Sequence, residues 1–347
     1  MIDMLENIKQ NFEQVLESDK DSSDLRSLSI SLDTFYALSS ALDVGIFQGL
    51  EEPKSSSELA ETLGLHKEIT EKLCKALASR GYLSRESGNY ALSDLARTFL
   101  TESSPFYQGS LIKLMQRTRA QRWSSLARAL KEGPIAAPSG PHVFDEFFAL
   151  AMAEGAVGGS LQRTIKALKR MPEFYRARRC LDLGGSHGLY SLTFAKSNPE
   201  LEVVLFDLPK VIEDAAKKVV YDSERIVTMA GDFNSDDLGK DYDFVFASDV
   251  LYREEKSLRP LLTRIRESLK HDGLLISKHF HIDDLVSDSS AVLFDLMFSI
   301  SGTGGVVYSS ADFSRLLESA GFSIAMVEDI SSPVSPSKII VARKVGG

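Results

Sequence analysis

The feature that most constrains the fold is the alternation of short apolar runs with helix-like spacers beyond Met171. Each run is apolar over several consecutive residues, which is typical of a strand buried on both faces of a sheet. Spacers such as KVIEDAAKKV and LRPLLTRIRESLK carry apolar residues at helical spacing. The strand-like runs, in chain order, are RRCLDL, EVVLFDL, RIVTMAG, DFVFAS and GLLISKHF. This alternation predicts an α/β domain with a doubly wound parallel sheet.

The C-terminal stretch departs from the alternation. It holds two further strand-like runs, FSIAMVEDI and KIIVARKV, which are joined only by a short Ser/Pro turn. Parallel neighbours need a longer crossover, usually through a helix, so these two runs are expected to pair as an antiparallel hairpin. We therefore expect a mostly parallel seven-stranded sheet that ends in an antiparallel C-terminal hairpin.

The first hundred residues show three helical segments followed by a hairpin, which predicts a winged helix. A long apolar helix is expected over 32–50, and the next helix begins with capping-box spacing between Ser55 and Glu58. After the third helix, YLSRESGNYALS reads as two short strands around a turn. Residues 1–18 add an apolar helical stripe that needs another surface to cover it.

Charge argues against a general polyanion-binding protein. The chain has 40 Lys and Arg against 49 Asp and Glu, a formal charge of −9. Between Ile30 and Glu102 there are seven basic and eleven acidic residues, whereas a winged helix that binds DNA needs a positive face. We expect no nucleic-acid partner, and the alternative of a transcriptional regulator with a ligand-sensing C-terminal domain stays open.

Cysteine use and hydropathy predict the compartment. Cys74 and Cys180 each lie in an apolar run, as buried free thiols do, which favours a reducing, cytoplasmic environment. The N-terminus lacks the apolar core of a signal peptide, and no apolar stretch approaches the length of a membrane span.

The strongest local motif is a glycine-rich turn, LDLGGSHG, that follows the first strand-like run. Glycines allow a sharp turn and close approach to a ligand. Asp207 ends the next strand, where a carboxylate can accept both hydroxyls of a ribose. Asp182, which leads the turn, would repel a pyrophosphate but attract a sulfonium or ammonium group. Asp232 and Phe233, after the third strand, suit an adenine, so the pattern favours S-adenosyl-L-methionine over a dinucleotide.

These motifs resemble those of the small-molecule O-methyltransferases of the caffeic-acid and acetylserotonin type, which are S-adenosyl-L-methionine-dependent enzymes with an N-terminal winged-helix dimerisation domain. LDLGGSHG, FDLPKVIEDA and GDF look like the family's first three motifs. The resemblance implies a homodimer, a small aromatic acceptor, and three parts: a dimerisation domain (1–104), a helical connector that contributes to the substrate pocket (105–170) and the methyltransferase domain (171–347). The implied cofactor-binding residues are Asp182, Gly184, Gly185, Gly188, Asp207, Leu208, Asp232, Phe233 and Ser248.

The catalytic position departs from the family. Tyr252 stands where the family has its general-base histidine, and Ser248 stands where a lysine is common. A neutral tyrosine is a poor base, because its ordinary pKa is about 10. His279 and His281, at the end of the fifth strand-like run, are the candidate substitutes. Partly exposed loop histidines are the alternative reading, and no metal is expected, although a site completed by Asp249 or Asp283 stays open.

Because Tyr252 stands in place of the family's histidine, more than one type of reaction stays open. O-methylation is favoured, and the alternative is a C-, N- or S-methyltransferase or a family member that does not transfer methyl groups.

Overall fold

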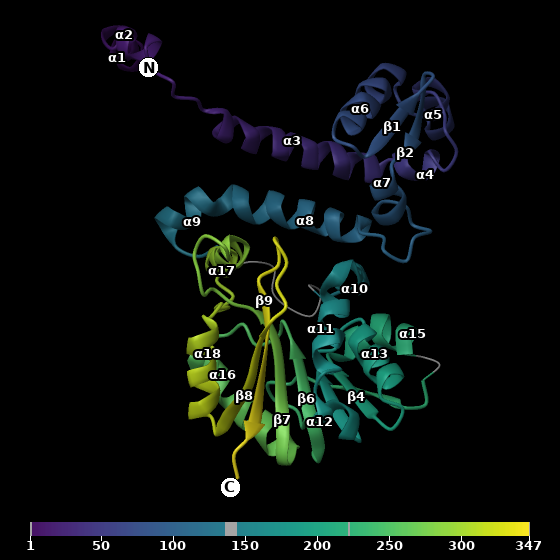
Figure 1. The fold of residues 1–347 in the computed structure, drawn as a ribbon, viewed down its shortest axis with the longest axis vertical. Helices are drawn as coiled ribbons and strands as arrows, with labels where there is room; N and C mark the ends of the chain where they lie inside the picture. The colour runs from purple at the N-terminus through teal and green to yellow at the C-terminus, as the bar shows by residue number, and fades with distance from the viewer. Residues whose placement is uncertain (1, 136–143, 221–222, 347) are drawn as a thin grey trace. The chain divides into compact units, whose positions relative to one another are not determined.

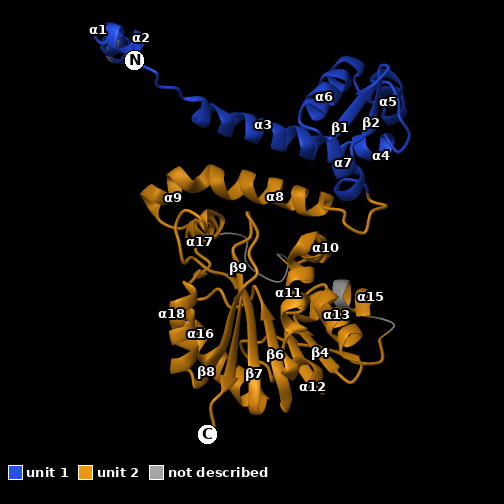
Figure 2. Cartoon of the chain, viewed as in Figure 1, with its two compact units in different colours: residues 1–101 blue, residues 102–347 orange. Residues whose placement is uncertain are grey.

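The computed structural model describes residues 2–135, 144–220 and 223–346. The chain divides into two compact units, residues 1–101 and residues 102–347 (Figure 2). Each unit has its own elements and is described separately. Within the expected connector at 105–170, residues 136–143 lie outside the described residues.

The first unit consists of helices and one small hairpin (Figure 1). Ser55 caps a helix as predicted, because its Oγ accepts from the N–H of Glu58 at 3.2 Å while the Glu58 carboxylate accepts from the N–H of Ser55 at 2.9 Å. The helix expected over 32–50 is instead two, since Gly45, at φ 77°, interrupts it. The elements are α1 (Ile2–Gln10), α2 (Phe12–Leu16), α3 (Ser23–Asp43), α4 (Ile46–Gly49), α5 (Ser56–Leu63), α6 (Lys67–Ser79), β1 (Leu83–Glu86), β2 (Asn89–Leu92) and α7 (Asp94–Phe99).

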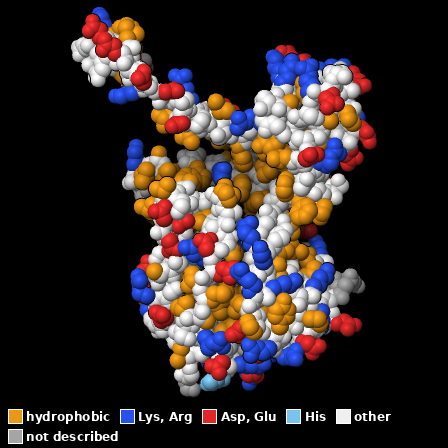
Figure 3. Space-filling model, in the orientation of Figure 1, with side chains coloured by type: hydrophobic (Ala, Val, Ile, Leu, Met, Phe, Trp, Pro, Cys, Tyr) orange, Lys and Arg blue, Asp and Glu red, His pale blue; other side chains and the backbone are white. Residues whose placement is uncertain are grey.

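The third helix of the winged helix, α6, carries its lysines in ion pairs. Lys67 pairs with Glu61, and Lys72 and Lys75 pair with glutamates four residues earlier, at N–O distances of 2.5 to 2.6 Å. Figure 3 shows acidic and basic side chains intermixed on the viewed face. An isolated basic surface, which DNA recognition would require, is therefore not found on α6.

The second unit is built on a sheet whose order, within the described residues, is β5-β4-β3-β6-β7-β9-β8. The strands from β5 to β7 are parallel, and β9 is antiparallel to β8, as predicted, and also to β7. The strands are β3 (Arg179–Leu183), β4 (Glu202–Asp207), β5 (Ile226–Ala230), β6 (Tyr242–Ser248), β7 (Leu269–Phe280), β8 (Phe322–Asp329) and β9 (Ser337–Lys344).

The helices of this unit partly precede the sheet in the chain and partly connect its strands. They are α8 (Gly109–Arg122), α9 (Leu126–Glu132), α10 (Glu146–Gly155), α11 (Leu161–Leu168), α12 (Pro172–Arg176), α13 (Leu189–Ser197), α14 (Pro209–Val211), α15 (Lys217–Val220), α16 (Glu255–Ser268), α17 (Ser289–Ser301) and α18 (Ser310–Ser319). In Figure 1, α16 and α18 lie on one side of the sheet and α12 and α13 on the other.

Side-chain alternation along the central strands divides the core into two layers. Phe244 and Phe246 of β6 pack with Phe174 and Phe194 from α12 and α13. The intervening residues of β6, among them Val245, join the opposite layer beneath α16 and α18. Because successive residues of a strand point to opposite faces, an apolar run without alternation fills both layers.

The order in which the strands are added to the sheet reverses direction between β3 and β6. From β3 the chain moves outward through β4 and β5, then returns to form β6 on the other side of β3. Open α/β sheets bind ligands at such a reversal, outside the carboxyl ends of the strands.

Candidate functional site

The glycine turn after β3 is shaped by close packing. Gly184 and Gly188 have φ values of 69° and 75°, which residues with a side chain rarely adopt. A Cβ at Gly184 would lie 2.6 Å from Cγ1 of Val250, in the loop after β6, and 3.7 Å from the ring of Phe233. A Cβ at Gly185 would lie 2.8 Å from Leu205 of β4. The turn therefore approaches both neighbouring segments too closely for larger residues.

Two carboxylates lie beneath and beside this turn. Asp182 of β3 is buried, and its carboxylate accepts a hydrogen bond from Ser191 Oγ at 2.6 Å. Asp207, the last residue of β4, accepts from the N–H of Ser186 at 2.8 Å and from that of Leu208 at 2.7 Å. The bond from Ser186 ties the end of β4 to the glycine turn, and Ser186 itself has a φ of 45°. Ser186 thus adopts a left-handed backbone conformation within the turn, as Gly184 and Gly188 do.

The pKa values of both carboxyl groups are raised, so a cationic ligand would favour their ionised forms. Burial raises the pKa of Asp182 to about 7, and the nearby negative charge of Asp207 adds to the effect. Burial also raises the pKa of Asp207, against the lowering effect of its two backbone hydrogen bonds. A positive charge placed near these groups would relieve the cost of ionising them.

The remaining predicted cofactor-binding residues come from three other strand ends. Asp232 lies two residues after β5, and its carboxylate is bonded to the backbone and side-chain amides of Asn234. Phe233 reaches the glycine turn, and the guanidinium of Arg253 stacks 4.9 Å from its ring centroid. Leu208 caps α14, and Ser248 ends β6, where its Oγ donates to Asp249 at 3.1 Å. The carboxyl ends of β3, β4, β5 and β6 thus bring the predicted set to one edge.

Tyr252 is enclosed by hydrogen bonds and rings. Its hydroxyl donates to Asp249 Oδ1 at 2.8 Å and accepts from the N–H of Phe280 at 2.6 Å. Burial, together with the charge of Asp249, raises its pKa well above the ordinary value. Its ring lies 5.3 Å and 5.6 Å from those of Phe294 and Phe298 of α17. Tyr252 therefore stays protonated, is less available as a base than an ordinary tyrosine, and forms part of an aromatic wall.

His279 holds the loop after β6 in place. Its Nε2 accepts from the N–H of Val250 at 3.1 Å and from that of Leu251 at 2.9 Å. Because Nε2 accepts hydrogen bonds, the proton is assigned to Nδ1, which lies 2.9 Å from Ser277 Oγ. Burial lowers the pKa of His279 to about 3. Since both nitrogens are engaged, the imidazole has no free lone pair with which to accept a substrate proton.

His281 is also buried. Its Nδ1–H donates to the carbonyl of Tyr308 at 3.1 Å, and its ring lies 5.7 Å from that of Phe313. Among the described residues its Nε2 has no hydrogen-bond partner. Burial lowers its pKa. The alternative reading of two partly exposed loop histidines is therefore wrong for both residues.

Asp249 also lies at this edge. From the sequence it was expected only as a possible metal ligand. It follows the last residue of β6 with a φ of 57°, an uncommon conformation for a residue with a side chain. Lys278 of β7 pairs with its carboxylate at 2.5 Å. The Asp249 side chain is 38% exposed, whereas that of Lys278 is 6% exposed. The signal in the sequence was a charged residue at the end of each of two apolar runs, Asp249 after β6 and Lys278 in β7. These two strands pair with each other in the sheet.

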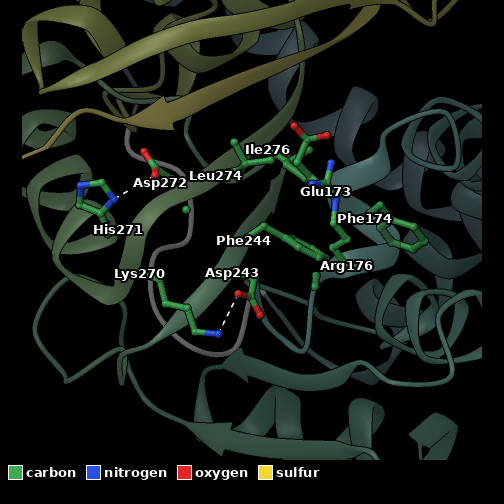
Figure 4. A pocket seen from close by; sticks show the side chains of 12 residues that line it. Glu173, Phe174, Arg176, Asp243, Phe244, Lys270, His271, Asp272, Leu274 and Ile276 are labelled. Carbon is green, nitrogen blue, oxygen red and sulfur yellow. Dashed lines mark hydrogen bonds and ion pairs between the residues drawn. The ribbon is translucent and has the colours of Figure 1, made fainter.

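A small hollow lies away from this edge. Figure 4 shows a small hollow of about 180 Å³ at the amino ends of β6 and β7, where Lys270 pairs with Asp243 at 2.7 Å. Within the ranges described, no group of three or more His, Cys, Asp or Glu side chains is placed to hold a metal ion. None of the helices formed by these residues has both the length and the apolar character needed to cross a membrane.

Comparison with known proteins identifies the family. A model of the O-methyltransferase domain matches residues 142–323, and a model of the O-methyltransferase dimerisation domain matches residues 32–102. An uncharacterized protein of Methanocaldococcus jannaschii is 26% identical, over 90% of this chain and 93% of its own length. The 3-hydroxy-5-methyl-1-naphthoate 3-O-methyltransferase of Streptomyces sahachiroi is 25% identical, over 89% and 92%.

The fold is also found in a solved structure. Human N-acetylserotonin methyltransferase, solved in complex with S-adenosylmethionine, superposes with a TM-score of 0.80 over 95% of this chain and 99% of the other, at 23% identity. The first family model alone covers more than half of the residues. The chain therefore belongs to the O-methyltransferase family, whose members are S-adenosyl-L-methionine-dependent enzymes.

Proposed function

We propose that the carboxyl edge of the sheet binds S-adenosyl-L-methionine and that the enzyme transfers its methyl group to a hydroxyl of a small aromatic acceptor. The observation that carries this proposal is the junction between the glycine turn and Asp207. One oxygen of Asp207 is bonded to the turn through Ser186, and each carboxylate oxygen keeps a lone pair for a ribose hydroxyl. When bound, S-adenosyl-L-methionine supplies an already activated methyl group.

The residues at this edge divide by the part of the cofactor that they suit. Asp182 and the turn from Gly184 through Gly185 to Gly188 suit the methionine end, because the turn permits close approach and the carboxylate favours a cation. Asp207 suits the ribose. Leu208, Asp232 and Phe233 suit the adenine, since they combine apolar faces with a hydrogen-bond acceptor. Ser248 lies between these groups and the aromatic wall.

The acceptor side favours a planar, apolar-bodied molecule. Tyr252 lies against Phe294 and Phe298, whose own rings are 4.6 Å apart. Aromatic side chains of this kind bind flat rings by stacking and edge contacts. The Streptomyces sahachiroi relative is named for an aromatic hydroxy acid, which supports the same class of acceptor.

The first unit supports a homodimer. The match to a dimerisation domain begins at residue 32, and apolar side chains along the first half of α3, including Leu25 and Leu28, are exposed. Exposed apolar stripes of this length are typical of surfaces covered in an assembly. We assign residues 1–104 to this function and residues 105–170 to the connector. A monomeric mass in light scattering at micromolar concentration would contradict the dimer.

Calorimetry with S-adenosylhomocysteine tests the cofactor site. Asp207→Ala is expected to weaken binding by at least about tenfold, because it removes charge-assisted hydrogen bonds. The matched control is Glu202→Ala, which removes a carboxylate from the first residue of the same strand. No binding by the unaltered protein, or equal binding by both variants, would contradict the proposal.

Labelled methyl transfer then tests the reaction. The protein is offered phenols, arylamines, thiols and carbon acids with labelled S-adenosyl-L-methionine, and products are separated by mass. Transfer to phenol oxygen is expected. Transfer only to carbon, nitrogen or sulfur would replace O-methylation by the corresponding alternative.

A further inference from the structure

The hydroxyl of an acceptor must lose its proton when it is methylated. Of the three candidate residues, His279 and Tyr252 are engaged in hydrogen bonds, and His281 is buried with an unpaired Nε2. Both nitrogens of His279 are hydrogen-bonded. The hydroxyl of Tyr252 donates to Asp249 and accepts from Phe280. His281 is buried against Phe313, with its Nδ1 bonded to a backbone carbonyl.

One ionised group at the same edge is exposed and close to the cofactor turn. Asp249 immediately precedes Val250, the residue against which Gly184 packs. Its side chain is 38% exposed, and Tyr252, which donates a hydrogen bond to it, forms the aromatic wall with Phe294. The carboxylate thus lies between the glycine turn and the aromatic side chains proposed to hold the acceptor.

We propose that Asp249 is the catalytic residue that receives the proton of the acceptor's hydroxyl, with Lys278 and Tyr252 as positioning residues. This inference rests on the proposed function of the edge as the methyl-transfer site. Lys278 holds one carboxylate oxygen and Tyr252 the other, so the carboxylate is fixed in direction. Oδ2 also accepts from Ser248 Oγ, whereas Oδ1 accepts only from Tyr252 and retains a second lone pair that can accept the substrate hydroxyl.

The chemistry balances without a strong base. The lone pair of the acceptor oxygen forms the new bond to the methyl carbon, and the electrons of the broken carbon–sulfur bond remain on sulfur. As this bond forms, the hydroxyl oxygen gains positive charge and its proton becomes acidic. A carboxylate suffices to accept it at that point, and the proton then passes from Asp249 to water. Positioning of the reactants supplies the rest of the acceleration.

The surroundings of Asp249 determine its charge. Burial acts to raise its pKa, but Lys278, His279 and the hydrogen bond from Tyr252 outweigh burial, so the pKa lies below its ordinary value. The charged and titratable groups that act on Asp249 or on Lys278 are Lys278 and His279 of β7, Tyr252 of the loop, Tyr190 of α13 and Arg163 of α11. Lys278 also lowers the pKa of His187 in the glycine turn.

The test compares matched variants on the same strand. Asp249→Asn removes the charge, and asparagine tolerates the left-handed backbone, so folding is expected to be preserved. Asp243→Asn removes a carboxylate at the opposite end of β6 that also pairs with a lysine of β7. With a phenol that the protein methylates, Asp249→Asn is expected to lower kcat by about 10²-fold or more, while Asp243→Asn leaves it within about twofold.

The pH profile tests for a base of low pKa. At saturating cofactor, kcat is expected to stay level from about pH 8 down to pH 5, whereas a base with the ordinary pKa of histidine would give an acid limb near 6.5. Lys278→Met removes the main opposite charge and is expected to move the acid limb upward by about one pH unit or more. A limb near pH 6.5 in the unaltered protein, or one that Lys278→Met leaves in place, would overturn the assignment.

A spectroscopic test of the same assignment does not require catalytic turnover. The absorbance of 4-nitrophenol reports its ionisation when it is mixed with excess protein. Removal of the carboxylate leaves the Lys278 ammonium unpaired, so in Asp249→Asn the nitrophenol is expected to ionise about one pH unit lower than in the unaltered protein. Identical spectra in the two proteins would overturn the inference, even where the methyl-transfer function holds. If the unaltered protein did not bind S-adenosyl-L-methionine, that result would instead contradict the proposed function.

Discussion

The carboxyl of Asp182 should couple cofactor affinity to pH. In the ligand-free protein its pKa is about 7, because the group is buried and lies near Asp207. A cationic ligand favours the ionised form, so binding is expected to release a proton wherever the free carboxyl is protonated. One pKa unit corresponds to about 1.4 kcal/mol, so the affinity is expected to fall about tenfold between pH 8 and pH 6.

Isothermal titration of S-adenosyl-L-methionine measures this coupling. Repeating the titration in buffers of different ionisation enthalpy counts the protons released, which we expect to approach one at pH 6 and to vanish at pH 8. The histidines nearest the site do not account for a change in this range, since burial lowers the pKa of His187 to about 4 and that of His279 to about 3.

Asp182→Asn provides the control. The amide keeps the shape and can accept from Ser191, but it cannot ionise. Its affinity is expected to be weaker at pH 8 and independent of pH between 6 and 8. An unaltered protein whose affinity is constant over this range, or a variant that keeps the pH dependence, would refute the reasoning.

Three further outcomes are expected. The folded state protonates Asp182 at a higher pH than the unfolded chain does, so the melting temperature without ligand should rise as pH falls from 8 to 6, and calorimetric melting of Asp182→Asn should remove this trend. Gly184→Ala should destabilise by about 1–3 kcal/mol in urea unfolding and abolish cofactor binding, because the new Cβ meets Val250; Gly64→Ala, at a similar φ but with open space, should leave binding unchanged. His279→Ala should cost about 1–3 kcal/mol by leaving two backbone N–H groups unpaired, and His279→Gln should recover part of that loss; equal unfolding midpoints for the two variants would count against the assigned role.

Most of the sheet was predictable because its strands are encoded locally. Continuous apolar runs between helical spacers indicated every strand from β3 to β7, and the short turn before β9 indicated the antiparallel end. The capping box at Ser55 was equally local. The helix expected over 32–50 was predicted wrongly, because its apolar pattern continues through a glycine that the backbone uses to change direction.

The candidate catalytic residues were less accessible to sequence reasoning. The order of the predicted strands placed Tyr252, His279 and His281 at the carboxyl edge of the sheet. It gave no information on which nitrogen or oxygen already makes hydrogen bonds. The hydrogen bonds to His279 come from residues 28 and 29 positions earlier in the chain. No periodicity encodes such pairs.

By itself the sequence determined the family, the sheet and the glycine turn, since these depend on hydrophobic pattern and on residues that tolerate a special backbone. Only the tertiary structure decided which polar groups at the carboxyl edge remain available. Parallel pairing of β6 with β7 sets Ser248 beside Lys278, and the left-handed turn at Asp249 then directs its carboxylate to that lysine. The availability of an ionised group depends on burial and on partners distant in sequence, and both arise only when the strands assemble.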